Sequence, residues 1–227
     1  MTLRQASVRI SEDTSVRAAL RRSSDASHQR MHGLKPFALI AAGSLPMSGY
    51  RSLLSSLFIF HSAVRAEAHI AGWSQLSSAG RRLDLLRGDL IFLGGKVPSR
   101  KCVWQAGPRE AALGALYAAE GSMLGGRVIS RLLDYAFGTG RDGRQFFIGD
   151  QCDGRNWAKL IQVLEARCAR ADALDAAIAG ALRTFDLFEE CILGGFGNQD
   201  GPIVDGQRSQ STVRERRLSK PVDCARL

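Results

Sequence analysis

The chain has 227 residues, of which 45% are hydrophobic and only 7% aromatic, and its formal net charge is +9 at neutral pH. This length and apolar content suffice for one sizeable core. No apolar run approaches the roughly 18 residues of a membrane span, and no signal-type apolar segment follows the first residues, so we expect neither. The positive charge suits acidic partners, among them nucleic acids, anionic lipids and acidic redox proteins.

The cysteines indicate a reducing environment. They form an odd set without a CxxC pair, namely Cys102, Cys152, Cys168, Cys191 and Cys224. This spacing favours neither a disulfide framework nor a zinc site. We therefore interpret them as reduced thiols and expect a cytoplasmic protein.

Helical periodicity dominates the middle of the chain. After a loose arm at 1–12, a first helix is expected within 11–34, capped by Asp13, Thr14 or Ser15. The second carries one apolar stripe that includes a histidine: Tyr50, Leu53, Leu54, Leu57, Phe58, His61 and Val64. This second helix is expected at 49–73. Four further helices are expected at 79–95, 108–138, 154–168 and 171–195.

No alternating strand pattern and no internal repeat accompanies these helices. Residues 198–227 are polar and lack apolar periodicity, which is typical of a disordered tail. The sequence therefore predicts one all-α domain at 13–197, flanked by the arm 1–12 and a basic tail at 198–227.

Few residues offer catalytic or metal chemistry. The four histidines, at 28, 32, 61 and 69, form no HExxH or ExxH motif, so zinc-protease and di-iron sites lose support. The Gly-rich segment GSMLGG lacks the preceding strand of a nucleotide-binding loop. A lone histidine on a helix can act as an axial ligand to haem iron, although most such residues are ordinary surface or core side chains.

The segment YAAEGSMLGGRVISRLL, residues 117–133, reads as a helix that contains Gly121, Gly125 and Gly126. Each glycine costs a helix interior roughly 0.5–1 kcal/mol relative to alanine. Gly121 and Gly125 are four residues apart, so in a regular helix they clear one face. That face could admit a flat ligand to the backbone or pack tightly against another helix, and Gly126 suggests a kink as well.

Two motifs give the chain a family resemblance. LRRSSDASH, residues 20–28, resembles the proximal helix of the haem oxygenases, and GALYAAEGSMLGGRVISRLL, residues 114–133, is similar to their distal helix. The resemblance spans 15–195 and is strongest to the bacterial branch associated with bacteriophytochromes. Three positions depart from the family pattern: Ser24 replaces threonine, His32 an acidic residue and Cys191 a tryptophan.

On the proximal side, the resemblance implies that His28 is the axial iron ligand and that Arg21 faces the haem propionates. Ser24 or a backbone carbonyl would accept a hydrogen bond from the second His28 nitrogen. Arg183 is a second candidate for the propionates, since arginine pairs well with carboxylates, or else a solvated surface residue. His32 lies one turn beyond His28 and could compete with it as a ligand.

On the distal side, the resemblance implies that Gly121 and Gly125 bring the backbone near the iron, with Gly126 contributing to the haem contact. O2 activation would depend on a water network anchored by backbone carbonyls and Ser122. Tyr117 would donate a hydrogen bond to a propionate or act as a core aromatic residue.

The implied fold is a single-domain helical one that holds haem between these two helices. Haem b would be both substrate and cofactor, and the implied products are biliverdin, carbon monoxide and ferrous iron. No flavin or nicotinamide motif is present, so electrons would come from an acidic ferredoxin or flavin reductase, and a bacteriophytochrome could receive the biliverdin.

Two alternatives remain open at this point. A haem carrier or sensor on the same fold is suggested by His32. A basic helical protein that binds nucleic acid is suggested only by the tail RSQSTVRERRLSK.

Overall fold

The computed structural model describes residues 15–99, 102–149 and 153–196, and all regular structure within these ranges is helical. Six long helices make up most of it: α1 (Val16–His32), α3 (Met47–Ile70), α4 (Ala79–Phe92), α5 (Arg109–Gly121), α9 (Asp153–Arg167) and α10 (Ala171–Phe196). Short helical segments connect them: α2 (Lys35–Ala41), η2 (Ser74–Leu76), η3 (Ser122–Gly125), α6 (Gly126–Leu132), α7 (Asp134–Phe137) and α8 (Gln145–Ile148). The expected all-α architecture is confirmed. The expected arm 1–12 and tail 198–227 lie outside the described residues.

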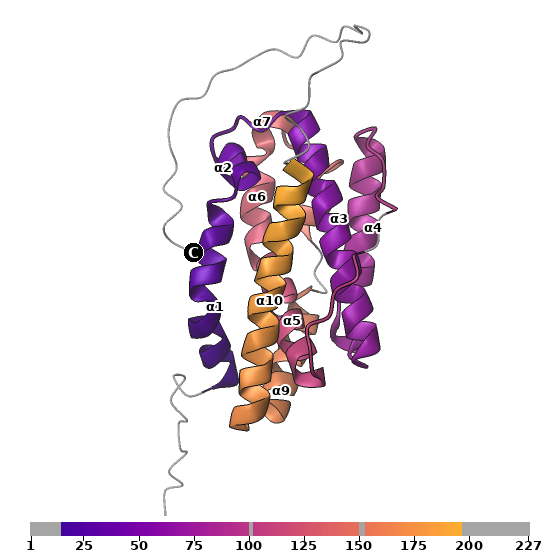
Figure 1. Ribbon diagram of the computed structural model, residues 1–227. Helices are drawn as coiled ribbons and strands as arrows, with labels where there is room; N and C mark the ends of the chain where they lie inside the picture. The colour runs from indigo at the N-terminus through magenta and orange to yellow at the C-terminus, as the bar shows by residue number, and fades with distance from the viewer. Residues whose placement is uncertain (1–14, 100–101, 150–152, 197–227) are drawn as a thin grey trace, which may run out of the picture.

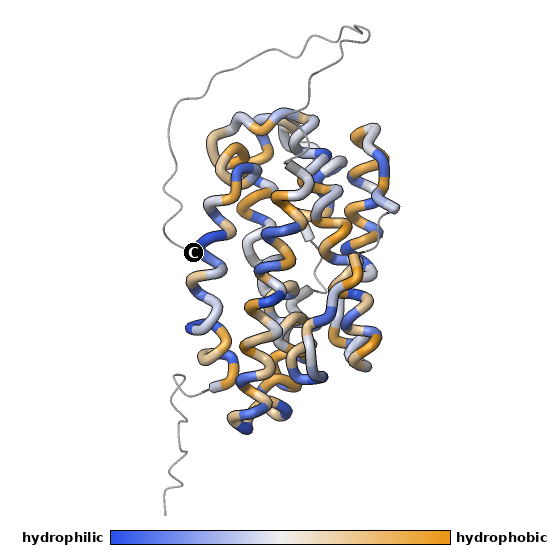
Figure 2. The backbone as a smooth tube through the Cα atoms, in the orientation of Figure 1, coloured by the Kyte–Doolittle hydropathy of each residue, from blue (hydrophilic) through white to orange (hydrophobic). Residues whose placement is uncertain are grey.

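Helix α10 runs along the middle of the bundle and packs against α5, α3 and α1. Helix α4 packs on the far side of α3, so α1 and α4 stand at opposite edges in Figure 1. Figure 2 shows α1 as largely hydrophilic, whereas apolar residues recur along α3 and α10. None of the described helices is both long and apolar enough to cross a membrane.

The contact between α5 and α10 depends on two glycines. A Cβ atom at Gly114 would overlap the carbonyl group of Ala177, and one at Gly180 would overlap the carbonyl group of Ala111. The two backbones therefore touch directly, with no room for a methyl group at either position.

A buried ion pair fixes the end of α5. The Arg82 and Glu120 side chains are about 2% exposed and lie 2.6 Å apart. Arg82 also donates to the Ala119 carbonyl at 2.9 Å, and the Ser78 N–H donates to Glu120 at 2.8 Å. Because a buried charge is costly unless it is paired and hydrogen-bonded, this network ties α4 firmly to the last turn of α5.

Most of the expected helices are confirmed, and Ser15 is the residue that caps α1, accepting from the Ala18 N–H. The expectation of one helix over 108–138 is wrong, because the segment divides into α5, η3, α6 and α7. The Ser122 hydroxyl donates to the Ala119 carbonyl at 2.8 Å, which satisfies a backbone acceptor at the break. Helices α2 and α8 were not expected; each is too short for a clear periodic pattern.

Candidate functional site

Helix α1 is held at its N-terminal end by a carboxylate from α9. Glu165 accepts hydrogen bonds from the Val16 and Arg17 N–H groups at 3.0 and 2.9 Å. These donors have no partner within their own helix, and a negative charge is favourable at a helix N-terminus. The start of α1 is therefore fixed relative to α9, and the rest of α1 lies along α10.

His28 stands on the exposed side of α1. Its ring meets the Phe185 ring of α10 edge-on, with centroids 6.3 Å apart, and the His32 ring lies 4.9 Å away. Partial burial, followed by the charge of His32, lowers the pKa of His28, while Asp25 acts in the opposite direction. His28 is therefore a neutral imidazole near pH 7, the form that binds a metal ion.

Two arginines share the flank of α1 that carries His28. Arg21 is seven residues before His28, or roughly 10 Å along the helix, and Arg17 lies one turn further. The positive charges of both arginines lower the pKa of Tyr117, although burial, the larger effect, raises it. The charges of Arg17 and Arg21 therefore reach Tyr117 of α5, while the ring of His28 packs against Phe185 of α10.

Ser24 lies one turn before His28 on nearly the same face of this helix. It is buried, and its hydroxyl donates to the Leu20 carbonyl of the preceding turn at 2.8 Å. Its proton is therefore used inside α1. Its oxygen can still accept a hydrogen bond, so Ser24 and a backbone carbonyl both remain candidates for the partner of the second His28 nitrogen.

The three glycines of the distal segment have different surroundings. A Cβ at Gly121 would make ordinary contact with the Trp157 ring at 3.4 Å, whereas one at Gly125 would meet nothing within 4 Å. A Cβ at Gly126 would come within 2.9 Å of the Phe147 carbonyl oxygen of α8. Ser122 and Gly125, the first and last residues of η3, are exposed, so the open part of this segment is this turn.

Arg183 lies apart from the α1 flank. Its guanidinium donates to the Ala106 carbonyl at 2.9 Å and approaches the backbone at Gly107. This contact secures the loop that leads into α5. The Arg183 guanidinium is thus held at this loop, whereas Arg21 and His28 share one face of α1.

Sequence reasoning missed several residues of this region. Arg17 could have been found, because it precedes Arg21 by one helical turn. Phe185, Trp157 and Glu165 could not, since they reach the site through contacts between helices far apart in the chain. Within the described residues, no three histidine, cysteine or acidic side chains gather as a metal-binding cluster.

The fold and these residues define an all-α protein with an accessible, neutral imidazole on its first described helix and a glycine-containing break between α5 and α6. No family model matches the chain. A haem oxygenase of Xanthomonas campestris pv. campestris is 40% identical over 114 residues, which cover 49% of this chain and 67% of that protein. The chain belongs to the haem oxygenase family, whose enzymes degrade haem.

Solved structures agree with this fold. The haem oxygenase of Neisseria meningitidis, solved with bound NO and CO, has a TM-score of 0.64 at 22% identity and covers 86% of this chain and 99% of that chain. Haem oxygenase-1 of the cyanobacterium Synechocystis, in complex with haem, has a TM-score of 0.64 at 16% identity, covering 81% and 93%. At these identities the likeness concerns the fold alone.

Proposed function

We propose that this protein cleaves haem b oxidatively, using O2 and externally supplied electrons, and releases biliverdin, carbon monoxide and ferrous iron. The observation that carries this proposal is the exposed, neutral imidazole of His28 on α1, beside Phe185 of α10 and on the same helix face as Arg21. Haem itself supplies the iron and the conjugated ring on which the oxidation takes place. The role of the chain is to bind and orient the haem and to limit access of water.

His28 binds the iron on the proximal side. A neutral imidazole nitrogen is a common iron ligand, and the lowered pKa of His28 keeps that nitrogen unprotonated near pH 7. Arg21 pairs with a haem propionate, because its spacing from His28 matches the distance from the iron to the edge of the ring. Burial raises the pKa of Tyr117 and the charges of Arg17 and Arg21 act against it, which supports Tyr117 as a hydrogen-bond donor to the same propionate.

The turn η3 covers the opposite face of the haem. Gly125 has open space where a side chain would stand, so the backbone can approach the ring there. Ser122 is exposed beside it, although its hydroxyl proton is directed to the Ala119 carbonyl. Its oxygen remains an acceptor that can hold an ordered water molecule. Gly121 and Gly126 act by shaping the turn.

The electron donor in this proposal is a separate acidic ferredoxin or flavin reductase. A net charge of +9 favours association with such a partner. The resemblance to the bacteriophytochrome-associated branch supports delivery of biliverdin to a photoreceptor. Cys102 and Cys168 are thiols rather than half-cystines, which supports a cytoplasmic location.

Paired histidine variants test the assignment of the ligand. His28→Ala should fold normally, because the side chain is exposed, but should lose the spectrum of histidine-ligated haem and nearly all bilin production. His32→Ala is the matched control on the same helix and should retain both. Loss of ligation in His32→Ala with retention in His28→Ala would overturn the assignment. Haem binding by the wild-type protein without bilin formation, given reductant and O2, would overturn the catalytic proposal.

A further inference from the structure

Two exposed histidines stand one helical turn apart at the end of α1. His28 and His32 are four residues apart in sequence, so they lie on one face of this helix. Their ring centroids are 4.9 Å apart, and the ring planes meet at 84°. The proposed function uses the imidazole of His28 and gives none to the imidazole of His32.

The separation of the two rings matches that of imidazoles bound to one metal ion. Histidines four residues apart on one face of a helix occur as ligand pairs in zinc sites. With tetrahedral angles and a zinc–nitrogen distance of about 2.0–2.1 Å, the centres of two such rings lie about 5 Å apart. The observed 4.9 Å therefore requires little movement of α1. Rotation about the last side-chain torsion, which is broad for histidine, turns one nitrogen of each ring toward a shared ion.

The surroundings of the pair favour a positive charge. His32 lies in the last turn of the 17-residue helix α1, where the helix dipole is negative. Asp25 is three residues before His28 and lies on the same flank. Burial and the charge of His32 lower the pKa of His28, whereas the Asp25 carboxylate acts to raise it and so stabilises positive charge at this position. The end of the helix and Asp25 would both attract a metal cation.

Two imidazoles leave the remaining coordination positions of a metal ion to water. Within the described residues, no third histidine, cysteine or acidic side chain gathers with the pair. Asp186 and Glu189 of α10 pair instead with Arg30, at 3.7 Å each. Both histidines are exposed, so water can reach an ion between them. A site of this kind suits a divalent transition-metal ion such as Zn²⁺, for which imidazole is a good ligand.

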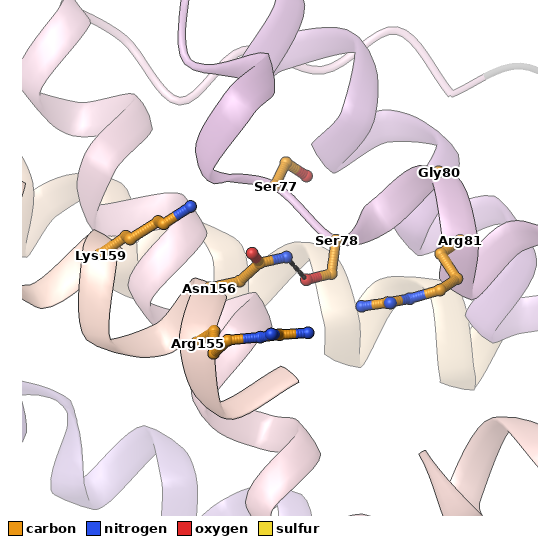
Figure 3. A pocket seen from close by; sticks show the side chains of 7 residues that line it. All are labelled: Ser77, Ser78, Gly80, Arg81, Arg155, Asn156 and Lys159. Carbon is orange, nitrogen blue, oxygen red and sulfur yellow. Dashed lines mark hydrogen bonds between the residues drawn. The ribbon is translucent and has the colours of Figure 1, made fainter. Parts of the chain in front are cut away.

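No other histidine of the chain belongs to such a pair. His69 is exposed in the last turn of α3, but the residue four positions before it is Arg65. His61 is 2% exposed in the core. A pocket of about 470 Å³ between the starts of α4 and α9, drawn in Figure 3, receives no imidazole, thiol or carboxylate from the described residues. The described residues that line it are Ser77, Ser78, Gly80, Arg81, Arg155, Asn156 and Lys159.

We propose that His28 and His32 together bind a divalent transition-metal ion in the haem-free protein, and that this ion and haem exclude each other. The metal site itself needs no haem chemistry. The exclusion rests on the proposed function, because it requires His28 to be the ligand of the haem iron as well. By linkage, each ligand then lowers the affinity for the other by the same factor. The availability of the metal ion thus regulates how much of the protein can bind haem.

Calorimetric titration of the haem-free full chain with Zn²⁺ tests the metal site. The wild type should show saturable binding that His28→Ala and His32→Ala each weaken by about tenfold or more, since one imidazole remains. His69→Ala is the matched control, because it also removes an exposed histidine from the last turn of a long helix, and it should bind zinc like the wild type. Thermal melts check that each variant is folded, and His32→Gln replaces His32→Ala if the latter is not.

Haemin titrations with and without saturating zinc test the exclusion. Zinc should lower the apparent haem affinity of the wild type by about fivefold or more and leave that of His32→Ala nearly unchanged.

Absence of saturable zinc binding in the wild type, or an equal loss in His69→Ala, would overturn the metal site. The haem assignment of His28 would survive that result if His28→Ala still lost haem ligation. Zinc binding through both histidines that leaves haem affinity unchanged would overturn the exclusion and count against His28 as the haem ligand.

Discussion

Gly114 and Gly125 belong to one Gly-rich segment of the chain, yet one is packed against another helix and the other faces open space. At Gly114 the backbone of α5 presses against the Ala177 carbonyl of α10, and no side chain fits. At Gly125 the turn η3 faces open space. The packed region gains close contact between helices, whereas the open region leaves the backbone accessible to a ligand. A glycine in a helical sequence therefore does not reveal by itself which of these two roles it has.

Gly121 and Gly126 sharpen this comparison. In a regular helix, Gly121 and Gly125 would share a face, but the chain changes to a 3₁₀ turn at Ser122. Each 3₁₀ residue turns by about 120° instead of 100°, so the two positions separate. The two glycines therefore have different surroundings: a Cβ at Gly121 would contact the Trp157 ring, whereas one at Gly125 would meet nothing within 4 Å.

The largest effect is expected for Gly114→Ala. The new methyl group would overlap the backbone of Ala177, which cannot move without displacing α10. We expect the free energy of unfolding to fall by about 3 kcal/mol or more, measured by urea denaturation of the haem-free protein. Gly88→Ala is the control, since Gly88 lies in α4 with nothing near its Cβ position, and it should add up to about 1 kcal/mol. Equal stability of the two variants would break the comparison.

A smaller loss is expected for Gly126→Ala. Its methyl group would stand 2.9 Å from the Phe147 carbonyl oxygen, and α8 is a short helix that can shift. The expected destabilisation is about 1–3 kcal/mol, again in the haem-free protein. A gain in stability would place Gly126 with the open region instead of the packed one.

Burial of a histidine in the helix core should also make the free energy of unfolding depend on pH. His61 is 2% exposed in the core of α3, and burial, followed by the charge of Arg82, lowers its pKa well below the usual value. Below pH 6.5 the unfolded chain binds a proton at His61 that the folded chain does not, so stability falls as the pH decreases.

Between about pH 5 and 6.5, the slope of the unfolding free energy against pH reports how many protons the chain takes up on unfolding. Replacing His61 with leucine should reduce this number by up to about one. Phe60→Leu is the control: it removes the neighbouring aromatic ring without a titratable group and should keep the slope. An unchanged slope in the His61 variant would show that water reaches this part of the core.

The smallest effect on stability is expected for Gly125→Ala. The methyl group enters open space, so the unfolding free energy should change by no more than about 1 kcal/mol. Under the proposed function, bilin production should nevertheless fall, because the methyl group would occupy the space above the haem. Unfolding of the haem-free variant as severe as that of Gly114→Ala would contradict the open-turn interpretation.

The sequence predicted the long helices well because apolar periodicity and caps such as Ser15 are local signals. It also placed Arg21 and His28 on related positions of one helix, since helical spacing alone determines this. Gly126 also indicated a kink in this segment, but local pattern could not give its form, a 3₁₀ turn that begins at Ser122. Nor could local sequence reveal that Arg183 bonds to the Ala106 carbonyl, because that loop is brought to α10 only by the fold.

The order in which the bundle is completed follows from the contacts of α1. This first helix is anchored by Glu165 through hydrogen bonds that span 149 and 148 residues, and it lies along α10. During synthesis from the N-terminus, α1 must therefore wait for α9 and α10 before it can dock. Such long-range closure is slow compared with the formation of a single helix. The His28 flank is thus among the last surfaces of the nascent chain to reach its final position.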